Sequence, residues 1–148
     1  MHDFPHNYVA GAAASSDGTV SLSSPGLADL ESAAPAEFGG PGDQWSPETL
    51  LVASVADCFI LSFKAIARAS KLQWNSLSCQ ANGTLEQVDR VTQFTGFSIR
   101  ATLDVPDGTN ESKAMRILQK AESSCLITNS LKADSHLEAD IKISGLAA

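Results

Sequence analysis

The feature that most constrains the fold of this chain is a long apolar segment whose sequence predicts a helix without a polar face. Ser46 at the N-cap, Pro47 at the first helical position and Glu48 in the first turn form a specific start signal. These residue types suit the unpaired N–H groups and the positive dipole end of a helix start. Apolar residues then occupy every face over residues 50–66. We expect a helix of this kind to be buried on all sides.

The residues after this helix predict an antiparallel hairpin with one buried face. Polar and apolar side chains alternate over residues 75–105, with a turn near Asp89 and Arg90. Such alternation is typical of strands that face a core on one side. The predicted inward-facing residues of the second strand are Val91, Thr95, Phe97, Ile99, Ala101, Leu103 and Val105.

Further elements are predicted on both sides of the hairpin. Residues 7–23 indicate two short strands around a turn at Asp17-Gly18, and residues 24–45, rich in glycine and proline, indicate a long loop. An amphipathic helix is expected from about Asn110 to Ser123 and a last strand over residues 136–144. An irregular or short helical piece is expected between them.

Together these elements predict an α+β fold in one domain, residues 1–148, with antiparallel sheet packed around a long central buried helix. A helix that is apolar all round needs more cover than one small sheet can give. We therefore expect an obligate homodimer, in which the sheet of one chain covers the helix of the other.

Charge and composition argue against several classes of binding partner and several cellular locations. A net charge of −7 and a pI near 4.7 argue against nucleic acid and anionic membranes, which select for clustered lysine and arginine. The N-terminus lacks the features of a signal peptide, and the apolar run Leu50–Leu61 is too short to span a bilayer. We expect a cytoplasmic protein, where free thiols persist.

Two of the three cysteines are candidates for redox chemistry. Cys58 lies in the middle of the apolar helix, three turns from its positive end, and taken alone it is read as packing. Cys125 follows the second helix, where the backbone can approach another element. If the two lie within disulfide reach, they form a nucleophile and a resolving thiol. Cys79 alternates with apolar neighbours on a strand and is read as core.

Other site classes have weaker support in the sequence. Glu48 lies ten residues before Cys58, about 15 Å along the helix axis, so within one chain it is expected to serve the helix start. In a dimer it could instead approach the partner's site. The three histidines show no metal-ligand spacing, so no metal or cofactor site is predicted.

The quoted motifs resemble those of one known family. Ser46-Pro47-Glu48-Thr49-Leu50-Leu51, followed by Asp57-Cys58-Phe59, resembles the first cysteine helix of the OsmC/Ohr family. Glu37-Phe38-Gly39-Gly40 is similar to the family's segment just upstream. Ala121-Glu122-Ser123-Ser124-Cys125, followed by Asn129-Ser130 and an alternating strand, is similar to its second cysteine motif.

The resemblance implies an intertwined homodimer and a thiol-dependent peroxidase that reduces organic hydroperoxides at the dimer interface. It makes Cys58 the peroxidatic thiol and Cys125 the resolving one. It makes Glu48 the acidic residue that orients an activating arginine. It also implies a dithiol reductant, of lipoyl type in the best-known members.

The chain departs from the family pattern at its expected cation. No arginine precedes Arg68 and no lysine precedes Lys64, whereas the family's activating arginine lies in the N-terminal region. Asp57 and Leu126 also stand where the family has a small residue and a proline. These departures keep a second hypothesis open, a binding module that holds an apolar or thiol-bearing small molecule beside Cys58.

Overall fold

The predicted central helix is present as α1, Pro47–Ala69, in the computed structural model, which describes residues 1–145. Its start carries a reciprocal cap. The N–H of Thr49 donates to Oγ of Ser46 at 3.1 Å, and the N–H of Ser46 donates to Oγ1 of Thr49 at 2.8 Å. Two otherwise unpaired N–H groups are satisfied in this way, which confirms the helix start predicted at Ser46.

The chain divides after Leu50 into two compact units. The first holds an antiparallel sheet of β1 (Gly11–Ala14), β2 (Val20–Ser23) and β3 (Leu30–Ser32) in that order. The first two strands and their turn match the prediction. The third was not predicted, because three residues inside a glycine- and proline-rich segment carry no readable alternation.

The rest of the predicted long loop is ordered by close backbone packing. A short 3-10 helix, η1 (Ala36–Phe38), follows β3, and Ser32 pairs with Trp45 in an isolated bridge. At Gly40 a Cβ atom would lie 1.6 Å from the carbonyl oxygen of Ala34, so only glycine fits there.

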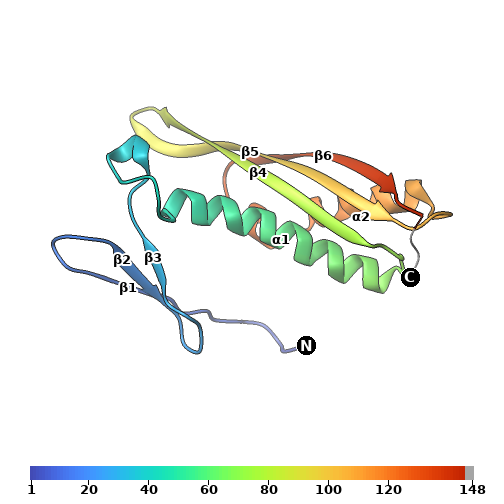
Figure 1. The fold of residues 1–148 in the computed structure, drawn as a ribbon, viewed down its shortest axis with the longest axis horizontal. Coiled ribbons are helices and arrows are strands. Elements are labelled where there is room, and N and C mark those ends of the chain that lie inside the picture. The colour runs from blue at the N-terminus through green and yellow to red at the C-terminus, as the bar shows by residue number, and fades with distance from the viewer. Residues whose placement is uncertain (146–148) are drawn as a thin grey trace. The chain divides into compact units, whose positions relative to one another are not determined.

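The second unit is built on a mixed sheet in the order β4-β5-β6 (Figure 1). Strands β4 (Ser76–Val88) and β5 (Val91–Val105) form the predicted antiparallel hairpin. Strand β6 (Asp134–Ile143) pairs with β5 in parallel, which differs from the all-antiparallel sheet we expected. The reason is topological, because the chain crosses back through α2 (Glu111–Ser123) and α3 (Leu126–Asn129) before it re-enters the sheet.

A β-bulge corrects the predicted face of β5 near its start. Thr84 pairs with Gly96 but Leu85 pairs with Phe94, so Thr95 is the extra residue and is exposed. Phe94 faces the core in its place and stacks on Phe97. The inward faces predicted for Thr95 and for Val91, which is also exposed, are therefore wrong. From Phe97 onward the predicted alternation is confirmed, because one extra residue reverses the faces only on one side of it.

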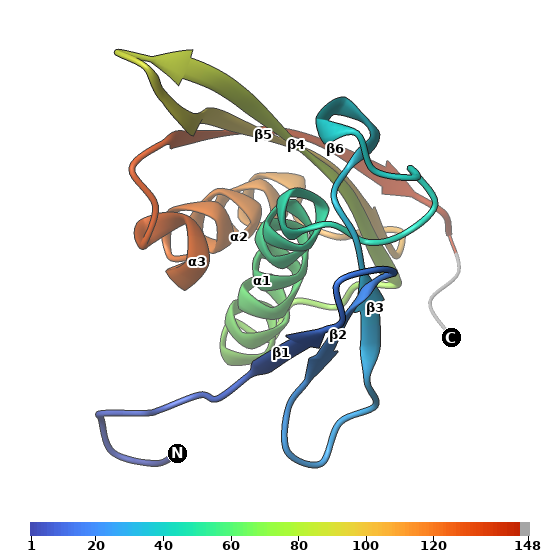
Figure 2. The same cartoon turned by 90° about the vertical axis from the view of Figure 1, so that its left-hand side faces the viewer.

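Helices α1, α2 and α3 lie on the same face of this sheet (Figure 2). The core joins a stripe of α1 to the inner faces of β5 and α2. The fully buried members of that stripe recur at every fourth position and are Val55, Phe59, Phe63 and Ala67.

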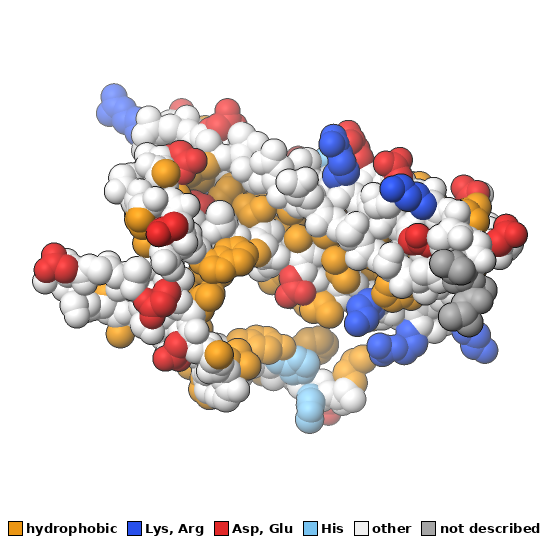
Figure 3. All heavy atoms as spheres, in the orientation of Figure 1, with side chains coloured by type: hydrophobic (Ala, Val, Ile, Leu, Met, Phe, Trp, Pro, Cys, Tyr) orange, Lys and Arg blue, Asp and Glu red, His pale blue; other side chains and the backbone are white. Residues whose placement is uncertain are grey.

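The remaining surface of α1 is not buried, contrary to our prediction for this helix. Leu61 is 56% exposed, and apolar side chains reach the molecular surface in Figure 3. By length and composition α1 could also cross a membrane, although we expected its apolar run to be too short. One such helix is weak evidence, because helices in protein cores pass the same test.

Gly83 offers a test of how tightly α1 packs on the sheet. A Cβ atom at this position would lie 2.8 Å from Cγ2 of Val52 and 2.9 Å from Cε1 of Phe94. We expect Gly83→Ala to lower the free energy of unfolding by about 1–3 kcal/mol through overpacking. Urea denaturation monitored by circular dichroism measures the change.

Gly96, on the neighbouring strand, provides the matched control. Nothing lies within 4 Å of a Cβ atom built there, and its φ is not in the left-handed region. We expect Gly96→Ala to change stability by less than about 0.5 kcal/mol. Equal effects of the two substitutions would contradict the close approach of α1 to β4.

Candidate functional site

The second unit brings two of the three cysteines together. Cys58 lies on α1 and is partly exposed, whereas Cys125 is fully buried. Each side chain is close enough to shift the pKa of the other. All three cysteines are free thiols in this structure.

Cys58 occupies the edge of the buried stripe of α1. It directly precedes Phe59, and consecutive residues of a helix are rotated by about 100°, so its side chain lies at the border between core and surface. One turn further on, Oγ of Ser62 lies 3.9 Å from its sulfur. The Asp57 side chain, rotated by about 100° from Cys58 on the helix, is exposed.

Cys125 is held where α2 ends and α3 begins. Its N–H donates to the carbonyl of Glu122 at 3.3 Å, and its own carbonyl accepts from the N–H of Asn129 at 3.0 Å. The side-chain amide of Asn129 also donates to the carbonyl of Ser123 at 3.3 Å. These bonds fix the turn that directs Cys125 into the core.

The environment of Cys58 raises the pKa of its thiol. Desolvation by burial is the largest cause, and the neighbouring Cys125 adds to it. The N–H of Ile127 and the hydroxyl of Ser62 act in the opposite direction but are outweighed. Cys58 is therefore mostly protonated at neutral pH.

The environment of Cys125 lowers the pKa of its thiol. Burial acts to raise it, but the peptide N–H of Thr128, the Cys58 thiol, the hydroxyl of Thr128 and the N–H of Ile127 together outweigh burial. Cys125 is the N-cap residue of α3 and makes no cap hydrogen bond as a neutral thiol. These donors consequently favour the thiolate, which is the better acceptor.

When only one proton remains on the pair, it is therefore bound mainly by the sulfur of Cys58. When the pair loses one proton, the charge is best placed on Cys125, with Cys58 as a donor toward it. Sequence reasoning missed the contribution of Ile127 and Thr128. The spacing Cys-x-x-Thr, which fits an N-cap and its N3 position, was a readable signal for it.

No cationic side chain contributes to either thiol. No lysine or arginine is among the groups that shift the pKa of Cys58 or Cys125. Within residues 1–145 the only ion pair joins Arg100 and Glu138 at 3.4 Å on exposed side chains. In the same range no three His, Cys, Asp or Glu side chains gather into a group that could hold a metal ion.

Glu48 and Cys79 are not among the groups that shift the pKa of either thiol of the pair. Glu48 sits in the first turn of α1, and its Oε2 atom is buried without a hydrogen-bond partner in the described part of the chain. Cys79 is half-buried on β4 and donates to the carbonyl of Ala56 at 3.5 Å. Burial raises the pKa of Cys79, which agrees with its reading as a packed residue.

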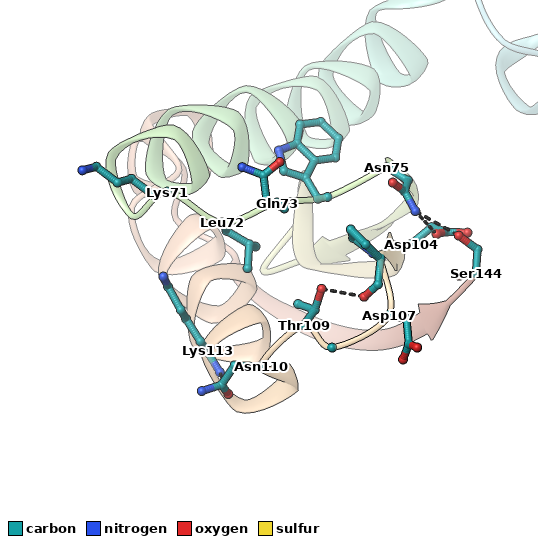
Figure 4. A pocket seen from close by; sticks show the side chains of 13 residues that line it. Lys71, Leu72, Gln73, Asn75, Asp104, Asp107, Thr109, Asn110, Lys113 and Ser144 are labelled. Atoms are coloured by element: carbon teal, nitrogen blue, oxygen red, sulfur yellow. Dashed lines mark hydrogen bonds between the residues drawn. The ribbon is translucent and has the colours of Figure 1, made fainter. Parts of the chain in front are cut away.

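A large cavity in the second unit does not contain the thiols. It has a volume of about 870 Å³ and lies between the end of α1 and the start of α2 (Figure 4). One wall is fixed by Asn75, whose amide donates to Asp104 at 2.8 Å and to Ser144 at 2.9 Å. Hydrogen bonds from Asn75 and Ser144 lower the pKa of the Asp104 carboxyl. This cavity contains no cysteine, and we assign the chemistry to the thiols instead.

Known proteins with a related sequence or structure place this chain in a family. It is 27% identical over 116 residues to the uncharacterized protein YmaD of Bacillus subtilis. This alignment covers 75% of this chain and 77% of that protein. The chain is 28% identical over 97 residues to peroxiredoxin OsmC of Escherichia coli, covering 66% of this chain and 67% of that protein. The structure of an OsmC-like protein of unknown function from Vibrio cholerae superposes with a TM-score of 0.83 at 17% identity, covering 92% of this chain and all of the other. Residues 40–140 match the OsmC-like protein family. The chain therefore belongs to the OsmC-like family.

Proposed function

We propose that this protein is a thiol-dependent peroxidase that reduces organic hydroperoxides through Cys58 and Cys125. The observation that carries the proposal is the pairing of a partly exposed thiol with a buried one inside a single unit. Access to solvent makes Cys58 the thiol that meets the peroxide. The relationship to a protein named peroxiredoxin OsmC supports the same activity.

The reaction proceeds in two balanced steps. The thiolate of Cys58 attacks the terminal oxygen of the hydroperoxide, the O–O bond breaks, and the alkoxide leaves and takes a proton to become an alcohol. Cys58 is then a sulfenic acid. The thiolate of Cys125 attacks its sulfur and expels hydroxide, which becomes water, so that a Cys58–Cys125 disulfide remains. A dithiol reductant, of lipoyl type by family resemblance, returns the pair to thiols.

The lowered pKa of Cys125 and the raised pKa of Cys58 give the two thiols different roles in these steps. Cys125 reaches the thiolate form that attacks the sulfenic acid at a lower pH than Cys58 would. Cys58 must first lose its proton, and in the part of the chain that the structure describes no lysine or arginine lowers its pKa. We therefore expect the attack on peroxide to be the slow step.

Apolar side chains around the pair suit an organic substrate. Leu126, next to Cys125, is 68% exposed, and Leu61, one turn after Cys58, is also exposed. Contact of an alkyl chain with such side chains stabilises binding by about 25 cal/mol per Å² of buried apolar surface. Hydrogen peroxide gains nothing from them.

A homodimer would complete the burial of α1. The apolar surface around Leu61 is open in the single chain, and on the same helix the buried Oε2 atom of Glu48 has no hydrogen-bond partner within residues 1–145. A second copy would cover the first and could supply a donor to the second. We place this dimer in the reducing cytoplasm, where free cysteines persist.

The second candidate is a binding module for an apolar or thiol-bearing small molecule. The raised pKa of Cys58 and the lack of a neighbouring cation favour this alternative, because both slow peroxide attack. The reaction of the thiols with one equivalent of hydroperoxide distinguishes the peroxidase from the binding module.

One equivalent of cumene hydroperoxide added to the reduced protein is expected to form the Cys58–Cys125 disulfide. Intact and peptide mass spectrometry detect it as the loss of two hydrogens. Cys125→Ser is expected to stop at the sulfenic acid of Cys58, which dimedone traps. Cys58→Ser is expected to leave the hydroperoxide unconsumed.

Cys79→Ser serves as the matched control and should form the disulfide as the wild type does. Unmodified thiols after prolonged exposure would exclude the peroxidase and leave ligand binding as the function.

The rate of the first step is expected to rise with pH. A free cysteine is only a few per cent thiolate at pH 7, and the raised pKa of Cys58 leaves it with less. We expect the single-turnover rate to increase about tenfold per pH unit between pH 7 and 8.5. Cys125→Ala removes a group that raises the pKa of Cys58, so its profile should move to lower pH. Consumption of hydroperoxide after a rapid mix, in single-turnover conditions, measures both profiles, and a flat profile would contradict the assignment of the proton to Cys58.

Leu61→Arg is expected to weaken the homodimer. Light scattering coupled to size exclusion should give twice the chain mass of 15.5 kDa for the wild type and a mass nearer that of one chain for the variant. Val91→Arg, at the similarly exposed tip of the β4–β5 hairpin, is the control and should keep the wild-type mass. A monomeric wild type would refute the dimer.

A further inference from the structure

The two sulfurs of the thiol pair differ in how an external molecule can reach them. Cys125 is 0% exposed, whereas Cys58 is partly exposed on α1. Reduction of a disulfide requires a thiolate to attack one sulfur in line with the S–S bond while the other sulfur leaves. The fold therefore makes the sulfur of Cys58 more accessible to an external thiolate than the sulfur of Cys125.

We propose that an external thiol attacks the sulfur of Cys58 in the Cys58–Cys125 disulfide, and that Cys125 leaves as a thiolate held by Thr128. The inference deepens the proposed function, since it concerns the disulfide that this function forms. It assigns both the entry of oxidant and the entry of reductant to Cys58.

The exchange is balanced in atoms and electrons. The attacking thiolate forms a new S–S bond to Cys58 as the Cys58–Cys125 bond breaks, and the electron pair of that bond stays on the sulfur of Cys125. With a dithiol reductant, the second thiolate then attacks its own sulfur in the mixed disulfide and releases the thiolate of Cys58. The dithiol is oxidised to a cyclic disulfide by two electrons.

Thr128 is placed to stabilise the leaving sulfur. Its side chain is buried, and its hydroxyl donates to the carbonyl oxygen of Cys125 at 3.2 Å. The Thr128 side chain is also among the groups that lower the pKa of Cys125, so it favours the thiolate there. The single proton of its hydroxyl can turn from the carbonyl to the sulfur when the S–S bond breaks, and the carbonyl keeps its bond from the N–H of Asn129.

The protonation of the pair supports the same direction of attack. The donors around Cys125 lower the pKa of its thiol, whereas burial and Cys125 itself raise the pKa of Cys58. A thiol of lower pKa is the faster leaving group. The exposure of Cys58 and the lower pKa of Cys125 thus both favour attack on the sulfur of Cys58 with the sulfur of Cys125 leaving.

The cysteines are well placed for a direct test, because each lies on its own tryptic peptide. Cleavage after lysine and arginine gives residues 1–64 with Cys58, residues 72–90 with Cys79 and residues 121–132 with Cys125. The full-length protein is oxidised with diamide, which does not depend on its peroxidase activity. It is then pulsed with excess glutathione and quenched with N-ethylmaleimide in guanidinium chloride at pH 6.5.

We expect glutathione on peptide 1–64 and N-ethylmaleimide on peptide 121–132. Glutathione found mainly on peptide 121–132 would overturn the inference while leaving the peroxidase proposal intact. Failure of diamide to form the disulfide would overturn it as well. If diamide forms the disulfide and hydroperoxide does not, attack at Cys58 still supports the inference, although the proposed function fails.

Thr128→Val and Thr128→Ser separate stabilisation of the thiolate from packing. The valine variant keeps the shape of the side chain but loses its hydroxyl, and we expect mixed-disulfide formation to slow by roughly two- to tenfold. The serine variant retains the hydroxyl and should stay near the wild-type rate. Equal rates for valine and wild type would remove Thr128 from the mechanism.

Discussion

The packing of one stripe of α1 against the sheet is the constraint on which the site depends. Val55, Phe59, Phe63 and Ala67 recur at every fourth residue and are all fully buried. Such a stripe fixes the rotation of a helix about its axis, since turning it would expose the two phenylalanines, each worth about 1.5–3 kcal/mol of burial. With the rotation fixed, Cys58 must lie at the border of the core. That border is where a thiol can contact both Cys125 and a molecule from outside.

The negative charge of the Cys125 thiolate is stabilised by hydrogen-bond donors and not by a cation. A buried thiolate is normally stabilised by a neighbouring positive group, and within residues 1–145 no lysine or arginine is among the groups that shift the pKa of either thiol. Here peptide N–H groups and a hydroxyl stabilise the charge on Cys125, at the cost of a more firmly protonated Cys58. The arrangement favours the resolving and leaving roles of Cys125 over the speed of the first attack. In a relative that kept a cation beside the first cysteine, the balance would lie the other way.

Much of the fold could be predicted from the sequence because it rests on local patterns. The helix start at Ser46 and the β4–β5 hairpin follow from a cap and from period-two alternation. The bulge at Thr95 could not be predicted, because one extra residue in an alternating strand is visible only through its partner. The parallel pairing of β6 and the proximity of Cys58 to Cys125 depend on where a crossover of about thirty residues returns, which no local pattern encodes. Thr128 lay within reach of sequence reasoning, since it stands three residues after a cysteine at a helix start.

Two unmet requirements of the single chain lie on the same helix. The outward surface of α1 leaves apolar side chains such as Leu61 in water, and among residues 1–145 the buried Oε2 atom of Glu48 has no donor. A buried carboxylate oxygen without a hydrogen bond costs free energy that a folded protein rarely leaves uncompensated. An apolar helix face costs free energy for a different reason, because it orders water. A second copy of the chain would relieve both, and it would also surround Cys58 with more apolar surface. Dimerisation would then affect the reaction as well as stability, since a drier environment raises the pKa of Cys58 further unless the partner brings a donor to it.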